Sequence, residues 1–202
     1  MASELQRRKT ALVFTAMDID EDGFLTYDDF VALAARWTVN RGLEPDSDEA
    51  AHLSAIMMGW WETLLAASDV NRDEKVTLDE VLLVVDLLAA DTAPVVATAA
   101  ALFEAIDADG DRRISSAEYR ELIETWNGAP TDTDEIFPLL DLDGDGHLSE
   151  EEFIKLWTEF WAGDNPNAPG TWVFGGSSCR SPSNALPSPP PGPRPGRACG
   201  GS

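Results

Sequence analysis

Apolar residues recur at helical spacing along most of this chain, and short polar segments separate the apolar runs. One helical period carries its apolar side chains at Phe30, Val31, Leu33, Ala34 and Trp37. After the polar break RGLEPDSD, an apolar-rich helix is predicted from about Asp48 to Ala67. This alternation continues along the chain and predicts an all-α fold with eight helices.

Two later breaks predict where further helices begin. The segment DTAP places Pro94 in the first turn of a helix, where a missing backbone donor is tolerated. The segment GAPTDTDE offers Thr131 as an N-cap, with Asp134 three residues on to complete a capping box. We therefore expect each break to open a helix that leads into an acidic segment.

Composition and charge narrow the possible partners. The 202 residues are 44% hydrophobic and 25% charged, which suits a globular body with one or two cores. The 14 basic and 37 acidic residues give a net charge of -23. Nucleic acids and anionic membrane surfaces both require Lys/Arg footprints, so neither is expected as a partner. Cations are the expected partner.

Neither a signal peptide nor a membrane span is predicted. The first apolar run is followed at once by Asp18 and Asp20, without a small-residue cleavage site, so it predicts an ordinary amphipathic helix. The most apolar region, Val81 to Phe103, is interrupted by two aspartates and by Pro94, and a span needs about 20 predominantly apolar residues. We expect a soluble, cytoplasmic protein.

The C-terminal end differs in composition from the rest. Residues 176–202 are rich in Pro, Gly and Ser and have no apolar period, so they are predicted to be a disordered tail. The two cysteines, Cys179 and Cys199, lie in this tail, which leaves no disulfide for the body and fits a reducing cytosol. Just before the tail, Trp172 and Phe174 are expected to fold back onto the body.

Four twelve-residue segments repeat along the chain: DIDEDGFLTYDD, DVNRDEKVTLDE, DADGDRRISSAE and DLDGDGHLSEEE. All four carry oxygen-bearing side chains at the first, third, fifth, ninth and twelfth places, which resembles the EF-hand loop. Ca²⁺ is a hard cation that takes about six to eight oxygens at roughly 2.3 to 2.6 Å, and a twelve-residue loop can wrap around it. The eighth residue is apolar in every copy, so we expect the loops to pair through it.

The predicted metal ligands are the first, third, fifth, seventh, ninth and twelfth residues of each loop, the seventh through its backbone carbonyl. In chain order they are Asp18, Asp20, Asp22, Phe24, Thr26 and Asp29; Asp69, Asn71, Asp73, Lys75, Thr77 and Glu80; Asp107, Asp109, Asp111, Arg113, Ser115 and Glu118; and Asp141, Asp143, Asp145, His147, Ser149 and Glu152. The ninth and twelfth residues alone also fit a capping box. The three oxygen-bearing residues upstream, repeated four times, favour metal binding.

The loops differ in ways that predict different affinities. The fourth loop has every expected ligand and Gly146 at the sixth place, where the chain must turn sharply. The third has Arg112 at that place, and the second has Glu74 there and Asn71 in place of an acid. The first ends in Asp29, whose side chain is shorter than that of Glu, so we expect weaker Ca²⁺ binding and a relative preference for Mg²⁺ at this loop. We expect three or four Ca²⁺ ions, with Mg²⁺ competing especially at the first loop.

The spacing of the loops resembles that of the sarcoplasmic calcium-binding protein family and its bacterial relative calerythrin. The gaps between loops span residues 30–68, 81–106 and 119–140, and the first is the longest. The resemblance covers roughly residues 4–175. It implies two EF-hand pairs, residues 1–90 and 91–175, packed into one compact body, and a first loop ending in Asp. In that family the second hand is often defective, so the nearly complete second loop is a departure.

The aromatic content bears on what such a protein does beyond binding ions. Calcium sensors expose flexible, Met-rich grooves, whereas this chain has four methionines and seven tryptophans. The tryptophans are Trp37, Trp60, Trp61, Trp126, Trp157, Trp161 and Trp172. Rigid aromatics favour a closed core, so the expected function is a cytosolic calcium buffer or signal carrier.

Two alternatives remain open. The first is a calcium sensor that opens to bind a dedicated protein partner, although the sequence identifies no such partner and we expect a monomer. The second is a carrier of a small aromatic ligand, because aequorin-type photoproteins and luciferin-binding proteins are similar four-hand bodies. Their substrate sites use His, Trp and Tyr, and this chain has only two histidines, His52 and His147. No paired His/Cys nucleophile, phosphate-binding glycine loop or H-E-x-x-H helix occurs, so we do not expect an enzyme.

Overall fold

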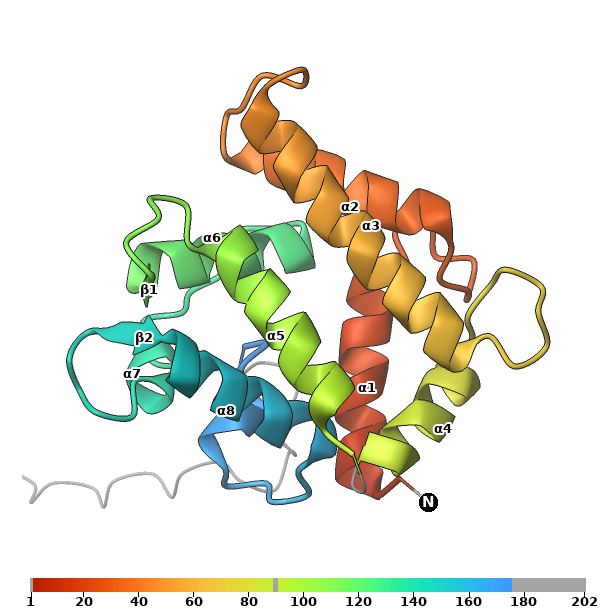
Figure 1. Ribbon diagram of the computed structural model, residues 1–202. Helices are drawn as coiled ribbons and strands as arrows, with labels where there is room; N and C mark the ends of the chain where they lie inside the picture. Colours follow the sequence, from red (N-terminus) through yellow and green to blue (C-terminus); the bar gives the residue numbers. More distant parts are fainter. Residues whose placement is uncertain (1, 89–90, 176–202) are drawn as a thin grey trace, which may run out of the picture.

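The computed structural model of the chain describes residues 2–88 and 91–175 (Figure 1). The predicted disordered tail and both cysteines lie outside the described residues. The elements in chain order are α1 (Glu4–Met17), α2 (Tyr27–Asn40), α3 (Asp48–Ser68), α4 (Leu78–Leu88), α5 (Ala93–Ile106), β1 (Arg113–Ser115), α6 (Ser116–Asn127), α7 (Phe137–Leu140), β2 (His147–Ser149), α8 (Glu150–Ala162) and the 3-10 helix η1 (Pro169–Trp172). The predicted all-α fold is confirmed.

Local sequence accounts for most helix ends. Ser3 caps α1, because its hydroxyl accepts from the Gln6 N–H at 3.1 Å while the Gln6 side chain accepts from the Ser3 N–H at 2.9 Å. Pro94 lies in the first turn of α5, as predicted. The first Asp of each repeat ends the preceding helix; in the fourth repeat the Asp141 N–H donates to the Phe137 carbonyl at 3.1 Å.

The predicted cap at Thr131 is wrong. The helix before the fourth repeat, α7, begins only at Phe137 and has a single turn. Thr131 instead donates its hydroxyl to the Ala129 carbonyl at 3.1 Å. Turns occupy the intervening segment, where the Thr133 carbonyl accepts from the N–H groups of Ile136 and Phe137. Pro138 then fixes the backbone in the first turn of α7.

The four repeats pair two by two through their eighth residues. Leu25 and Val76 exchange backbone hydrogen bonds of 2.8 and 3.0 Å, and β1 pairs antiparallel with β2 so that Ile114 faces Leu148. All four side chains are fully buried. Burial of these apolar side chains stabilises each pair, so the expected pairing of the loops is confirmed.

All the long helices contribute to one hydrophobic core. In Figure 1, α2 and α3 lie side by side, as do α5 and α8, and α1 lies between them and contacts both α4 and α8. The end of the described chain closes this core: the Phe174 ring lies 4.8 Å from Phe160, 5.1 Å from Trp126 and 5.2 Å from Trp157 between ring centroids. The expected return of this segment onto the body is confirmed.

A polar contact also joins the helices that follow the first and third repeats, α2 and α6. Glu121 on α6 accepts a hydrogen bond from the Trp37 indole N–H at 2.9 Å and forms an ion pair with Arg41. Arg41 donates in addition to the carbonyl of Ile106, the last residue of α5, at 3.0 Å. The two predicted pairs therefore pack as one body. Their division at residue 90 stays a prediction.

No single helix in residues 2–88 and 91–175 is long and apolar enough to cross a membrane. Only α4 and α5 taken together have the required length and composition, and they are bent by 110° at the break between them.

Candidate metal centre

Each repeat forms a loop between the end of one helix and the first turn of the next. The loops follow α1, α3, α5 and the single-turn α7, and they lead into α2, α4, α6 and α8. The helix–loop–helix arrangement therefore occurs four times, although its entering helix is very short in the fourth copy. Every predicted ligand residue lies in one of these loops or in the helical turn that follows it.

The backbone of all four loops turns in the same way. The fourth and sixth residues have positive φ in each: Glu21 and Gly23, Arg72 and Glu74, Gly110 and Arg112, and Gly144 and Gly146. A non-glycine residue in this left-handed region costs roughly 1–2 kcal/mol. The second loop carries that strain twice and still adopts the conformation, so its geometry does not depend on glycine.

A shared hydrogen-bond network holds the side chains of the first, third and fifth residues inside each loop. In the fourth loop, Asp141 Oδ2 accepts from the Gly146 N–H at 2.8 Å, Asp143 Oδ1 from the Asp145 N–H at 3.1 Å, and Asp145 Oδ1 from the His147 N–H at 2.9 Å. The equivalent three bonds occur in the other three loops at 2.8–3.2 Å. The backbone N–H groups are thus satisfied, and oxygen atoms gather inside the loop.

The twelfth residue closes the loop and caps the following helix at the same time. Glu152 Oε2 accepts from the N–H and hydroxyl of Ser149 at 2.9 and 2.7 Å, while Oε1 accepts from the Leu142 N–H at 3.0 Å. Glu118 makes the equivalent bonds in the third loop. The capping and metal-binding interpretations of this position are therefore compatible, because a capped carboxylate still has lone pairs for a cation.

These hydrogen bonds decide the charge of the closing carboxylates. Burial raises the pKa of Glu152, but hydrogen bonds from Ser149, Leu142 and Asp143 outweigh it, so the pKa lies below its usual value. The pKa of Glu118 is lowered by the same balance. At Glu80 the hydrogen bonds from Thr77 are the largest influence, and they also lower the pKa. All three closing glutamates are ionised at neutral pH.

Carboxylate oxygens converge in three of the loops. Oxygens from Asp18, Asp20 and Asp22, from Asp107, Asp109 and Glu118, and from Asp141, Asp143 and Glu152 lie within 4.8 Å of one another in each group. Such clustered anionic oxygens repel one another without a counter-ion. An all-oxygen donor set in a flexible loop fits Ca²⁺ and offers nothing that selects a soft metal.

The first loop differs at its closing residue. Asp29 is 3% exposed and accepts from the Ile19 N–H at 2.9 Å and the Thr26 N–H at 2.8 Å, the same donors that a glutamate uses in the third and fourth loops. The converging oxygens of this loop come from Asp18, Asp20 and Asp22, without Asp29. Burial, with smaller contributions from Asp29 and Asp22, raises the pKa of Asp18.

The second loop has an amide where the others have a third-position acid. Asn71 Oδ1 accepts from the Asp73 N–H at 2.9 Å, as the aspartates do elsewhere, while its Nδ2 donates to Asp73 Oδ2 at 3.0 Å. The loop therefore has the same shape with one fewer negative charge. Its weaker binding of a cation than the fourth loop stays a prediction.

One feature of the loops was not predicted from the sequence. Two of the seventh residues, expected to contribute only their backbone carbonyls, reach across to the paired loop through their side chains. Lys75 Nζ lies 4.7 Å from the centre of the Phe24 ring, and Arg113 Nη1 lies 3.3 Å from Asp145 Oδ2. The repeat pattern carries no signal for these contacts, because they depend on how two loops lie relative to each other.

Comparisons with known proteins agree with this geometry. Residues 97–158 match the family described as an EF-hand domain pair, and residues 11–34 match a single EF hand. A sarcoplasmic calcium-binding protein from Scylla paramamosain is 28% identical over 187 residues, covering 87% of this chain and 97% of the crab protein.

Two solved structures share the fold. The sarcoplasmic calcium-binding protein from amphioxus has a TM-score of 0.67 and 19% identity, covering 87% of this chain and 99% of its own. The coelenterazine-binding protein from Renilla muelleri, in its calcium-loaded apo form, has a TM-score of 0.68 and 20% identity, covering 86% and 99%. The chain has the EF-hand fold. In sequence and fold it resembles the sarcoplasmic calcium-binding proteins.

Proposed function

We propose that this chain binds Ca²⁺ through its EF-hand loops and acts as a cytosolic calcium buffer or signal carrier. The convergence of carboxylate oxygens inside three loops is the observation that carries the proposal. The twenty-four predicted ligand residues are the proposed metal site. The second loop adds a fourth site of lower affinity, because it has the same hydrogen-bond network and one fewer charge.

The arrangement of the interior favours a buffer over a sensor. A sensor opens a Met-rich groove on binding Ca²⁺. Here Met17 and Met57 are buried, and the core is filled by packed rings such as Phe30, Trp61 and Trp157. Rigid aromatic packing resists opening, so the protein is proposed to stay closed. It is also proposed to be a monomer and not an enzyme. The relatives compared here are calcium-binding proteins, which agrees with this assignment.

Calorimetric titration with Ca²⁺, with and without millimolar Mg²⁺, tests the binding. We expect three or four ions with dissociation constants between about 10⁻⁸ and 10⁻⁵ M, and a Mg²⁺ effect greatest at the first loop. Absence of binding in this range refutes the proposal. Hydrophobic-dye fluorescence measured with Ca²⁺ and with a chelator distinguishes buffer from sensor, because a strong Ca²⁺-dependent rise indicates an opened groove.

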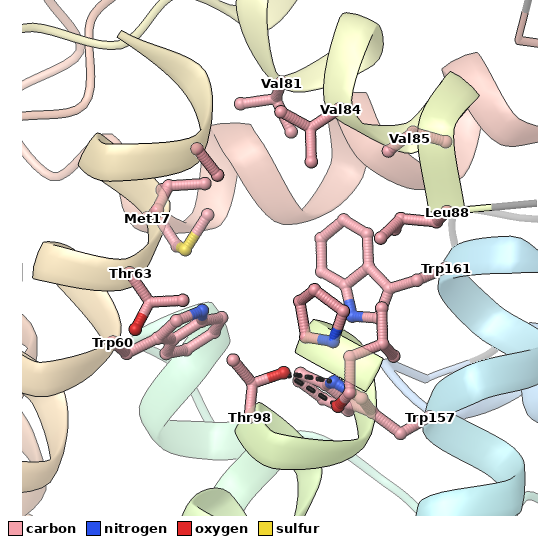
Figure 2. Close-up of a pocket in the computed structure, with 14 residues that line it drawn as sticks. Met17, Trp60, Thr63, Val81, Val84, Val85, Leu88, Thr98, Trp157 and Trp161 are labelled. Atoms are coloured by element: carbon pink, nitrogen blue, oxygen red, sulfur yellow. Dashed lines mark hydrogen bonds between the residues drawn. The ribbon is translucent and has the colours of Figure 1, made fainter. Parts of the chain in front are cut away.

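A second candidate function rests on an apolar, partly open cavity between the helices (Figure 2). The cavity has a volume of about 90 Å³ and is lined by residues of α1, α3, α4, α5 and α8, including Trp60, Trp157 and Trp161. It shares Trp60 and Thr98 with a larger groove of about 430 Å³ between α3 and α5. Thr98 accepts from the Trp157 indole N–H at 3.2 Å, which satisfies the donor of one of the three tryptophans in the wall.

The cavity alone is smaller than the roughly 150 Å³ that holds a benzene molecule in an engineered core, so a ligand would also occupy the groove. A small, mostly apolar aromatic molecule is the class that such a wall accepts. The Renilla muelleri neighbour is a coelenterazine-binding protein, which agrees with this candidate. Coloured or fluorescent material that copurifies with the protein and is lost in Trp60→Ala supports it, while a ligand-free protein that binds no aromatic probe excludes it.

A further inference from the structure

The third loop places positive charge on the acidic residues of the fourth. Arg113, the seventh residue of the third loop, lies with Nη1 3.3 Å from Asp145 Oδ2. Its neighbour Arg112 lies with Nη2 3.4 Å from Glu150 Oε2. Asp145 is the fifth residue of the fourth loop and belongs to the proposed ligand set, whereas Glu150 does not.

We infer that Arg113 is an internal counter-ion of the fourth loop that lowers the Ca²⁺ affinity of that loop and links it to the third. The inference rests on the proposed function. The side chain of Arg113 occupies a ligand carboxylate that Ca²⁺ needs, so the ion must displace it or bind against its charge. As seventh residue of its own loop, Arg113 also supplies the backbone carbonyl proposed for the third site.

The size of the effect follows from exposure. The side chains of Arg113 and Asp145 are 53% and 44% exposed, so solvent weakens their attraction. Exposed ion pairs contribute about 0.2–1 kcal/mol, and loss of such a competitor corresponds to an affinity gain of about 1.4- to 5-fold. Salt must reduce the gain, because the screening length shortens from about 30 Å at 0.01 M to about 3 Å at 1 M.

The first pair of loops lacks this arrangement. Its seventh-position cation, Lys75, lies over the Phe24 ring at 4.7 Å and not on a carboxylate of the first loop. Because Lys75 contacts a ring, it does not form an ion pair with the ligand carboxylates of the first loop. The counter-ion effect is therefore expected only in the second pair.

Arg113→Gln tests the inference, because it removes the charge and keeps a long polar side chain. The matched control is Arg120→Gln, which removes an arginine paired with Asp134, a carboxylate outside the loops. Nuclear magnetic resonance of the Gly146 amide reports on the fourth loop, since its N–H donates to Asp141 Oδ2, and the Gly110 amide reports on the third.

In a Ca²⁺ titration followed at Gly146, Arg113→Gln should bind about 1.4- to 5-fold more tightly than the wild type at low salt, and the gain should be much smaller at high salt. Arg120→Gln should leave the affinity at Gly146 nearly unchanged. Equal shifts in the two variants, or no shift in Arg113→Gln while the wild type binds, overturn the inference. If Gly146 of the wild type does not respond to Ca²⁺, the proposed function of the fourth loop is itself wrong, and the inference falls with it.

Discussion

Replacing Glu152 by Gln is the sharpest perturbation of the fourth loop. The change keeps the side-chain length and removes one negative charge. Each Glu152 oxygen accepts from backbone or hydroxyl donors, Oε1 from Leu142 and Oε2 from Ser149. A glutamine offers only one acceptor oxygen, because its amide nitrogen donates. Hydrogen bonds to a charged group contribute about 1.5–3 kcal/mol, so we expect the ion-free protein to lose about that much stability.

The loss of Ca²⁺ affinity should be larger. One negative charge at about 2.5 Å from a divalent ion contributes about 3 kcal/mol even with the dielectric constant of water. Such a difference corresponds to a loss of affinity on the order of 10²-fold at the fourth loop. The other loops should keep their affinities, apart from a smaller effect on the paired third loop.

Calorimetric Ca²⁺ titration of the variant, with unfolding by urea in a chelator, measures both quantities. Glu151→Gln is the matched control, because Glu151 lies beside Glu152 in the same turn, is exposed, and is not a proposed ligand. The reasoning is refuted if Glu152→Gln binds as many ions as Glu151→Gln with unchanged affinities.

Three further predictions concern stability in a chelator. The closing glutamates of loops 2, 3 and 4 have lowered pKa values, so the stability that they give the fold is present above the ordinary pKa of about 4.3 and is lost as the pH falls below it. Urea unfolding between about pH 5 and pH 3 should show this loss, and the loss should be smaller in Glu152→Gln. Phe174→Ala should lower the free energy of unfolding by about 3–5 kcal/mol, because it empties a site among three rings. Tyr27→Ala, at a 55% exposed position, should lower it by under about 0.5 kcal/mol. Equal losses contradict the packing argument. Gly146→Ala should lower the free energy of unfolding by about 1–2 kcal/mol through its positive φ alone, since the added carbon meets nothing within 4 Å. Gly59→Ala, in the middle of α3, should stabilise the protein. Thermal unfolding measures both changes, and unchanged stability of Gly146→Ala contradicts the strain argument.

Much of the fold could be predicted because its signals are local. The repeats locate the loops, Pro94 locates the start of α5, and the eighth-position residues predict the pairing seen between Ile114 and Leu148. The cap predicted at Thr131 failed because turns and Pro138, seven residues later, compete with the cap for the same segment. A capping pattern shows that a helix can begin at a residue, and the neighbouring turns decide whether it does.

Parts of the site could not be predicted because they depend on tertiary geometry. Contact between Arg113 and Asp145 joins residues 32 positions apart, and nothing in either loop alone indicates it. The left-handed backbone at Glu21 and Arg72 was also missed, because only the sixth position carries a recognised glycine preference. The apolar cavity arises from the way five helices meet, and the apolar pattern of any one helix cannot indicate it.

The second loop shows why loop shape and ion affinity must be considered separately. It has the weakest ligand charge, with Asn71 at the third place, and two strained residues, yet its network matches that of the other loops. Val76 pairs with Leu25 and both are fully buried, so packing of the pair holds the loop in shape whether or not an ion binds. An ion that binds only the folded loop adds about 2.7 kcal/mol at 100 times its dissociation constant. We therefore expect a weak second site to contribute little of that stabilisation, while its buried Val76 still pairs with Leu25 of the first loop.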